Sequence, residues 1–110
     1  MSKISATITA LGAYVPEHIL SNAMLENMVD TNNEWIIART GIKERRILKE
    51  NGKGTSYLAI NAAKDLIKKT ELDPSTIDLV IVATATPDMK AASTASFTAT
   101  AIGACNAFSF

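Results

Sequence analysis

The 110-residue sequence has few of the residues on which several kinds of site depend: one cysteine, one histidine, five glycines and three prolines. A single cysteine cannot form an internal disulfide, and Cys105 and His18 are not spaced as metal ligands are, so we predict neither a disulfide framework nor a metal site. The 11 basic and 11 acidic residues cancel, which leaves no broad positive charge to attract nucleic acid or an anionic membrane. The first residues contain no apolar signal segment, and we expect a cytoplasmic protein.

Charge is nevertheless uneven along the chain. Residues 31–53 contain six basic and three acidic side chains. A ligand that carries phosphate could be bound there, and the alternative is a solvated strand and loop, because charged residues are mostly exposed in any case.

Three segments carry clear signals of secondary structure. Between Thr55 and Thr70, apolar residues recur at helical spacing while lysines cover the other side, which predicts an amphipathic helix. Residues 79–83 form a short aliphatic run that is typical of a central strand buried on both faces. Residues 4–11 alternate apolar and hydroxyl side chains, which predicts a first strand with one buried face.

Capping signals place two further helices in the first half of the chain. Asn22 can cap a short helix that continues to Val29. Thr31 and Glu34 have the spacing of a capping box, which predicts a second helix over about residues 32–38.

Glycines end two of the predicted helices, and the resulting order of elements indicates the fold class. Gly41 follows the second helix, and Gly103 follows an Ala- and Thr-rich helix that Ser93 can cap, before a final strand at residues 106–110. Strands and helices that alternate in this way predict an α/β fold with a mostly parallel or mixed sheet. A central strand needs neighbours on both sides, and the most apolar elements come last, so we interpret the sequence as part of a larger α/β protein.

The arrangement most suggestive of binding is formed by Thr31, Trp35 and Arg39, whose spacing of four places them on one helix face. An indole and a guanidinium one turn apart form a slot for a flat π system such as a purine, with the nearby basic residues available to its phosphates. The alternative is structural. In that interpretation Thr31 is only a cap, Trp35 is a partly buried packing residue, and Arg39 pairs with Asp30 or Glu34.

Cys105 and His18 are the default candidates for a nucleophile and its base. Cys105 follows a predicted helix and so lacks the helix N-terminus that would stabilise a thiolate. We therefore predict a buried structural cysteine and place His18 in a surface loop.

The segment Met28–Arg46 carries the most specific motif of the chain. It reads MVDTNNEWIIARTGIKERR and resembles the D-T-x-x-E-W-I-x-x-R-T-G-I-x-x-R signature of the β-ketoacyl-acyl carrier protein synthase III family, which are thiolase-like condensing enzymes. Residues 10–16 resemble the family's G-x-G-x-Y-x-P turn, with Ala10 in place of the first glycine, and residues 80–88 resemble its second strand and loop. The resemblance spans the whole chain.

This resemblance implies a thiolase-like layered αβαβα fold, of which residues 1–110 would form a partial N-terminal domain with a mixed sheet. It also implies that Trp35 and Arg39 hold the adenine of coenzyme A between them, with Thr31 contributing. Coenzyme A thioester would then be a substrate, and no permanently bound cofactor is expected.

The implied reaction condenses an acyl-CoA primer, such as acetyl-CoA, with malonyl-acyl carrier protein and so initiates fatty acid biosynthesis. It uses a Cys-His-Asn triad whose cysteine motif would begin at Phe108. Because Cys105 does not match that motif, no catalytic residue is expected within the chain.

The resemblance also implies a homodimer, with residues 106–110 at its interface. Ala91 stands where relatives that select short primers carry an aromatic residue, which implies a wider choice of primer. Two alternatives stay open: a related acyltransferase that makes polyketide or quinolone precursors, and a non-catalytic fragment that binds coenzyme A.

Overall fold

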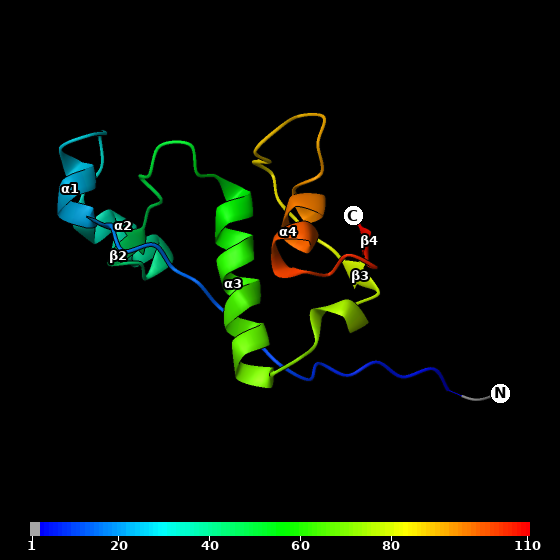
Figure 1. The fold of residues 1–110 in the computed structure, drawn as a ribbon. Coiled ribbons are helices and arrows are strands. Elements are labelled where there is room, and N and C mark those ends of the chain that lie inside the picture. The colour runs from blue at the N-terminus through cyan, green and yellow to red at the C-terminus, as the bar shows by residue number, and fades with distance from the viewer. Residues whose placement is uncertain (1–2) are drawn as a thin grey trace. The chain divides into compact units, whose positions relative to one another are not determined.

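A computed structural model describes residues 3–110, which divide into two compact units. The first unit consists of residues 54–110 together with the described residues up to Tyr14, and the second consists of Val15–Lys53. Each unit is described by itself (Figure 1). Within residues 3–110, no helix combines the length and the apolar character needed to cross a membrane.

Two helices that lie side by side form the body of the first unit. They are α3 (Thr55–Thr70) and α4 (Thr94–Ile102) (Figure 1). The bounds of α3 are those predicted from its apolar spacing, which confirms that prediction. Helix α4 is also confirmed: Ser93 is its N-cap residue, although its side chain makes no capping hydrogen bond, and Gly103 ends it at a φ of 84°.

The buried side of α4 consists of small residues. Ala95, Ala99, Thr94 and Thr98 are all buried, which lets the helix lie close to its neighbours. The Thr98 hydroxyl donates to the Thr94 carbonyl at 2.9 Å, so this polar side chain is satisfied within its own helix.

Two short parallel strands complete the first unit, β3 (Leu79–Val80) and β4 (Phe108–Ser109), and the turn η1 (Pro74–Thr76) precedes them. The pairing is secured by the Phe110 N–H, which donates to the Val80 carbonyl at 2.9 Å. The prediction that the strand at residues 79–83 is buried on both faces is wrong for the described residues, because Leu79 and Ile81 are 52% and 63% exposed. Strand β3 has a single neighbour among residues 3–110, and the described residues cover only part of those two side chains.

The second unit contains β1 (Ile19–Ser21), α1 (Asn22–Glu26), α2 (Asn33–Thr40) and β2 (Glu44–Arg46). Strands β1 and β2 are antiparallel. The described residues therefore contain one antiparallel and one parallel pair of strands rather than the single mixed sheet that was predicted.

Both helix starts in this unit differ by one residue from the predictions. Ser21, not Asn22, caps α1, since its hydroxyl accepts from the Met24 N–H at 3.3 Å. Asn32, not Thr31, caps α2, since its side-chain oxygen accepts from the Trp35 N–H at 2.8 Å. The predicted capping box is therefore absent, and the side chain of Asn32 takes the place of Thr31 as hydrogen-bond acceptor for the first turn of the helix.

The predicted strand at residues 4–11 is not formed. These residues have no strand partner in the described chain, and the apolar side chains of Ile4, Ile8 and Leu11 are exposed. Alternation of apolar and hydroxyl residues indicates a face to be buried and an edge to be paired, and residues 3–110 supply neither.

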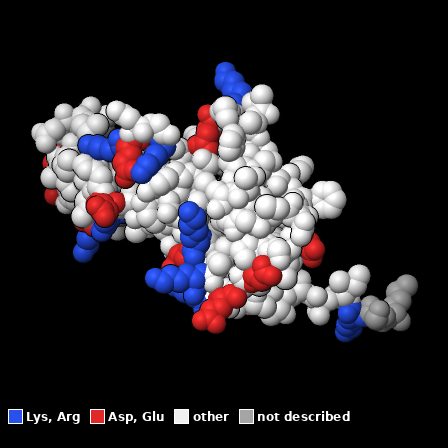
Figure 2. Space-filling model, viewed as in Figure 1, with Lys and Arg blue, Asp and Glu red and all other residues white. Residues whose placement is uncertain are grey.

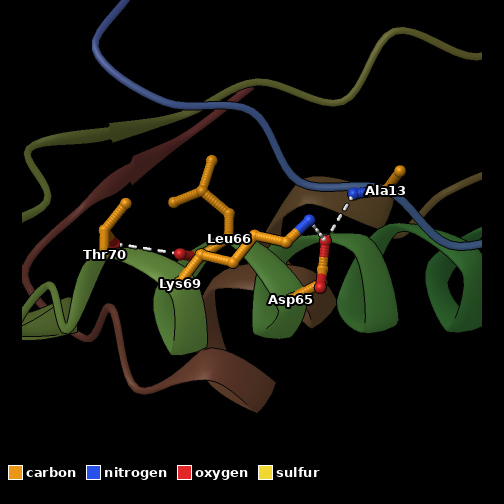
Figure 3. Close-up of polar contacts among 5 residues, drawn as sticks. All are labelled: Ala13, Asp65, Leu66, Lys69 and Thr70. Carbon is orange, nitrogen blue, oxygen red and sulfur yellow. Dashed lines mark hydrogen bonds and ion pairs between the residues drawn. The ribbon is translucent and has the colours of Figure 1, made fainter.

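The end of this N-terminal segment is held against α3 by Asp65 (Figure 3). Its carboxylate accepts from the Ala13 N–H at 3.0 Å and from the Lys69 ammonium at 2.5 Å. The chain approaches closely here, because a Cβ on Gly12 would lie 2.6 Å from the Cβ of Leu66. Glycine at position 12 is thus required by space.

Charged side chains of both signs occur on the face of the molecule that Figure 2 shows. On the face seen in Figure 2, lysines and arginines lie beside aspartates and glutamates instead of forming a patch of one sign. Glu50 pairs with Lys53, and Glu44 lies 4.0 Å from Arg46.

We expect the Asp65 contacts to make stability depend on acid. The hydrogen bond from Lys69 and then the one from the Ala13 amide hold the pKa of the Asp65 carboxyl below its ordinary value of 3.8. Its contribution is therefore fully present above pH 3.8 and is lost as the pH falls through the lowered pKa of the folded state. In thermal unfolding from pH 7 down to about pH 2, Asp65→Asn should lower Tm at pH 7 and flatten the fall of Tm in acid.

Asp78→Asn is the matched control for this measurement, because the Asp78 side chain makes no hydrogen bond or ion pair among the described residues. Parallel pH profiles for the wild type and Asp65→Asn would contradict the assignment.

Candidate functional site

Helix α2 brings Trp35 and Arg39 into contact on its exposed side. The guanidinium carbon of Arg39 lies 5.4 Å from the centroid of the Trp35 ring, as the spacing of four predicts. The helix is oriented by Ile36, which is buried, and its end is fixed by Gly41 at a φ of 70°. One side of α2 is therefore packed through Ile36, while Trp35 and Arg39 are exposed to solvent.

The structure separates the alternatives for these two residues. Trp35 is 55% exposed, so it is partly covered, as a packing residue would be, and more than half of it is accessible. No carboxylate in the described part of the chain lies within ion-pair distance of Arg39. An exposed indole covered by an unpaired guanidinium is a surface available for a ligand.

Thr31 lies beside this pair but not on the helix. It precedes the N-cap, so the prediction that it continues the helical face is wrong. Together with Asp30, Asn32 and Trp35, it lines a hollow of about 210 Å³. The hollow thus combines the indole with a hydroxyl, a carboxylate and an amide, which are groups able to hydrogen-bond the edge of a base.

The distance between Trp35 and Arg39 is too short for a base to lie between them in this arrangement. A flat ring stacked on both sides needs about 3.5 Å to each neighbour, or roughly 7 Å in all. The observed 5.4 Å means that a base either displaces the exposed Arg39 side chain or stacks on the part of the indole that borders the hollow.

Asn22 is the residue that positions this site, and sequence reasoning assigned it only a cap. It is 2% exposed, and its amide nitrogen donates to the Asn33 side-chain oxygen at 3.0 Å and to the Ile42 carbonyl at 2.9 Å. Its side-chain oxygen accepts from the Arg45 guanidinium at 2.9 Å. The backbone N–H of Asn22 also donates to the Lys43 carbonyl at 3.2 Å.

These bonds satisfy every hydrogen-bonding group of a buried amide, and they join α1 to the start of α2, to the turn after α2 and to β2. No local pattern signals such a role, because the partners lie 11 to 23 residues away.

Cys105 and His18 do not form a catalytic pair by any contact that the structure gives. Cys105 is exposed, so the prediction of a buried structural cysteine is wrong. His18 lies in the loop that precedes β1, as predicted, but it is partly buried and not at the surface. Its carbonyl accepts from the Ile47 N–H at 2.9 Å, and its Nε2 is buried. Among residues 3–110, no group of three or more His, Cys, Asp or Glu residues is placed to hold a metal ion.

Comparison with known proteins identifies the relatives of the chain. No protein-family model matches it. Over all 110 residues it is 56% identical to β-ketoacyl-[acyl-carrier-protein] synthase III 2 of Bacteroides thetaiotaomicron. The chain is homologous to β-ketoacyl-[acyl-carrier-protein] synthase III over its whole length. It spans about a third of these relatives, 33% in the case of the Bacteroides protein.

Solved structures agree with this relationship. The fold matches β-ketoacyl-[acyl-carrier-protein] synthase III of Thermus thermophilus with a TM-score of 0.85 and 44% identity, over 96% of this chain and 32% of that chain. It also matches the priming β-ketosynthase of the R1128 polyketide pathway with a TM-score of 0.83 and 33% identity, over 92% of this chain and 30% of that one. The predicted thiolase-like α/β fold is thus confirmed.

Loss of the Asn22 side chain should loosen the unit that carries Trp35. Asn22→Ala leaves partly buried donors and acceptors on Asn33, Ile42 and Arg45 without their partner, and we expect the free energy of unfolding to fall by about 2–3 kcal/mol. Asn22→Asp should also destabilise, because it places an acceptor opposite two acceptors. Denaturant unfolding of the intact protein measures both.

Asn27→Ala is the matched control, since the Asn27 amide is exposed and donates only to the Ala23 carbonyl within its own helix. A loss after Asn22→Ala no larger than that after Asn27→Ala would show that the network does not hold the unit together.

Proposed function

We propose that this chain is part of an acyltransferase of the β-ketoacyl-acyl carrier protein synthase III type. The intact protein would condense an acyl-CoA primer, such as acetyl-CoA, with malonyl-acyl carrier protein and so initiate type II fatty acid biosynthesis. Identity of 56% along the whole chain supports this activity. The single observation that carries the role of these residues is the exposed Trp35 and Arg39 pair beside a polar hollow.

In this proposal Trp35, Arg39 and Thr31 bind the nucleotide of coenzyme A, which is a substrate and not a resident cofactor. The base stacks on Trp35, where each stacked base contributes about 1–3 kcal/mol. Thr31 is placed to bond the edge of the base, and Arg39 can turn from the indole toward a phosphate because its side chain is exposed.

Such an anchor acts at a distance from the reacting bond. Binding energy from the nucleotide can hold the thioester carbonyl near a nucleophile supplied elsewhere in the intact protein. The described residues supply the anchor only. Cys105 has no hydrogen-bond partner among them that would activate its thiol.

A homodimer and a cytoplasmic location belong to the same proposal. The edge of β4 that faces away from β3 offers unpaired backbone groups, and the large apolar side chains of Phe108 and Phe110 are exposed beside it. A paired edge in a dimer would cover both. A chain with one cysteine needs no oxidising compartment.

A second candidate is priming of a polyketide pathway, favoured by the 33% identity to the R1128 priming ketosynthase. The two functions share the same chemistry and differ in the acyl group that is accepted. Steady-state rates with acetyl-CoA and with longer acyl-CoA primers distinguish them.

Removal of the stacking surface should weaken the use of acyl-CoA. For the intact protein, Trp35→Ala should raise KM for acetyl-CoA by about tenfold or more while kcat changes little, because the indole contacts the nucleotide and not the reacting atoms. Trp35→Phe keeps a stacking ring and should recover most of the affinity.

Ile37→Ala, which alters a partly exposed aliphatic residue of the same helix, controls for damage to α2. An unchanged KM in Trp35→Ala, or an equal rise in Ile37→Ala, would remove the basis for the anchor.

The covalent acyl group should form outside this part of the protein. Incubation of the intact protein with acetyl-CoA should add one acetyl group by mass spectrometry, and Cys105→Ser should not abolish the adduct, since no neighbouring group activates Cys105. Loss of the adduct in Cys105→Ser would make this cysteine the nucleophile.

A further inference from the structure

The longest helix begins without a cap of its own. The N-cap residue of α3 is Gly54, which has no side chain to accept from the first amides, and the first turn contains no acidic residue. The first N–H groups of a helix have no partner within it and favour an oxygen, above all a charged one.

The missing cap comes from a loop 32 residues further along the chain. The Asp88 carboxylate accepts from the Ser56 N–H at 2.9 Å. Beside it, the Thr55 hydroxyl donates to the Thr86 carbonyl at 2.5 Å. Two adjacent residues of α3 are thus bonded to two positions of the segment 84–93, which we call the 84–93 loop.

Gly54 provides the space for this carboxylate. Its φ of −138° and ψ of −151° are extended values that any residue can adopt, so the backbone does not require glycine. A Cβ at this position would collide with the Asp88 side chain. The glycine and the aspartate are therefore a matched pair, in which one makes room and the other caps.

The end of the 84–93 loop forms one edge of an apolar cavity of about 670 Å³. Ser56 and Ile60 of α3 form one side, and Ala92, Ser93 and Phe97 belong to the loop end and to α4. The Ser93 side chain makes no capping hydrogen bond to α4. At this end of the loop only the Ser93 carbonyl is bonded to α4 among the described contacts, accepting from the Ser96 N–H at 3.1 Å and the Phe97 N–H at 3.4 Å, whereas Asp88 and Thr86 bond the middle of the loop to the first turn of α3.

We propose that Asp88 is a positioning residue: it caps α3 in place of Gly54 and thereby holds the 84–93 loop, so that Ala92 and Ser93 stay at the edge of the cavity. It acts through the loop and not on a substrate. This inference does not rest on the proposed function.

Limited trypsin digestion of the intact protein tests the proposal, because Lys90 lies inside the loop. Asp88→Ala should raise the rate of cleavage after Lys90, relative to cleavage after Lys49 in the same digest, by about fivefold or more. Gly54→Ala should act in the same direction, since its methyl group displaces the carboxylate. Asp88→Asn keeps one acceptor oxygen and should restore much of the protection.

Asp78→Ala is the matched control, an acidic residue of the same unit whose side chain makes no hydrogen bond among the described residues. Its ratio of cleavage should equal that of the wild type. An unchanged ratio in both Asp88→Ala and Gly54→Ala would overturn the proposal.

A double variant separates positioning of the loop from simple capping of the helix. In Gly54→Ser with Asp88→Ala, the new serine can cap α3 locally, because the carboxylate that it would meet is gone. Fast cleavage after Lys90 should persist in this variant whether or not Tm recovers. If protection of Lys90 returns with the local cap, Asp88 is only a cap and does not position the loop.

Discussion

The buried amide of Asn22 is the interaction on which the candidate site depends. Its three side-chain hydrogen bonds and its backbone bond join α1, α2, the turn at Ile42 and β2. The unit that it joins has little apolar core, since Ile36, which is 7% exposed, is the only buried hydrophobic residue among residues 15–53. In a unit with so few buried apolar side chains, a fully satisfied polar network supplies much of what makes one arrangement unique. Trp35 is therefore presented by a helix whose start and end are both tied to Asn22.

Polar side chains play the same part in the first unit. Asp65 joins the N-terminal segment to α3, and Asp88 joins the 84–93 loop to the first turn of the same helix. The buried hydrophobic residues of this unit are alanines, which bury little area. Many large apolar side chains are exposed in the described chain, among them Phe108 and Phe110. Local order here rests on carboxylates and amides that bridge distant segments.

The sequence predicted the features that depend on neighbouring residues in the chain, and it failed for features that depend on packing against distant segments. Helix α3 follows from its apolar spacing, and Gly41 and Gly103 end their helices with positive φ as predicted. The contact of Trp35 with Arg39 follows from helical geometry alone. The strand predicted at residues 79–83 is formed over Leu79–Val80 but is not buried on both faces, and the strand predicted at residues 4–11 is not formed. Both patterns describe burial, and burial depends on neighbours that residues 3–110 do not contain. The caps were displaced by one residue because two neighbouring residues at each helix start, Ser21 and Asn22 or Thr31 and Asn32, are both of capping type, and residue type alone does not decide between them.

In the proposed function, Trp35 binds the nucleotide end of coenzyme A. Titration calorimetry of the intact protein with coenzyme A and with pantetheine, which lacks the nucleotide, tests it most directly when wild type and Trp35→Ala are compared. We expect the substitution to weaken binding of coenzyme A by about tenfold or more and to leave binding of pantetheine unchanged. Equal effects on both ligands, or no effect on coenzyme A, would contradict it.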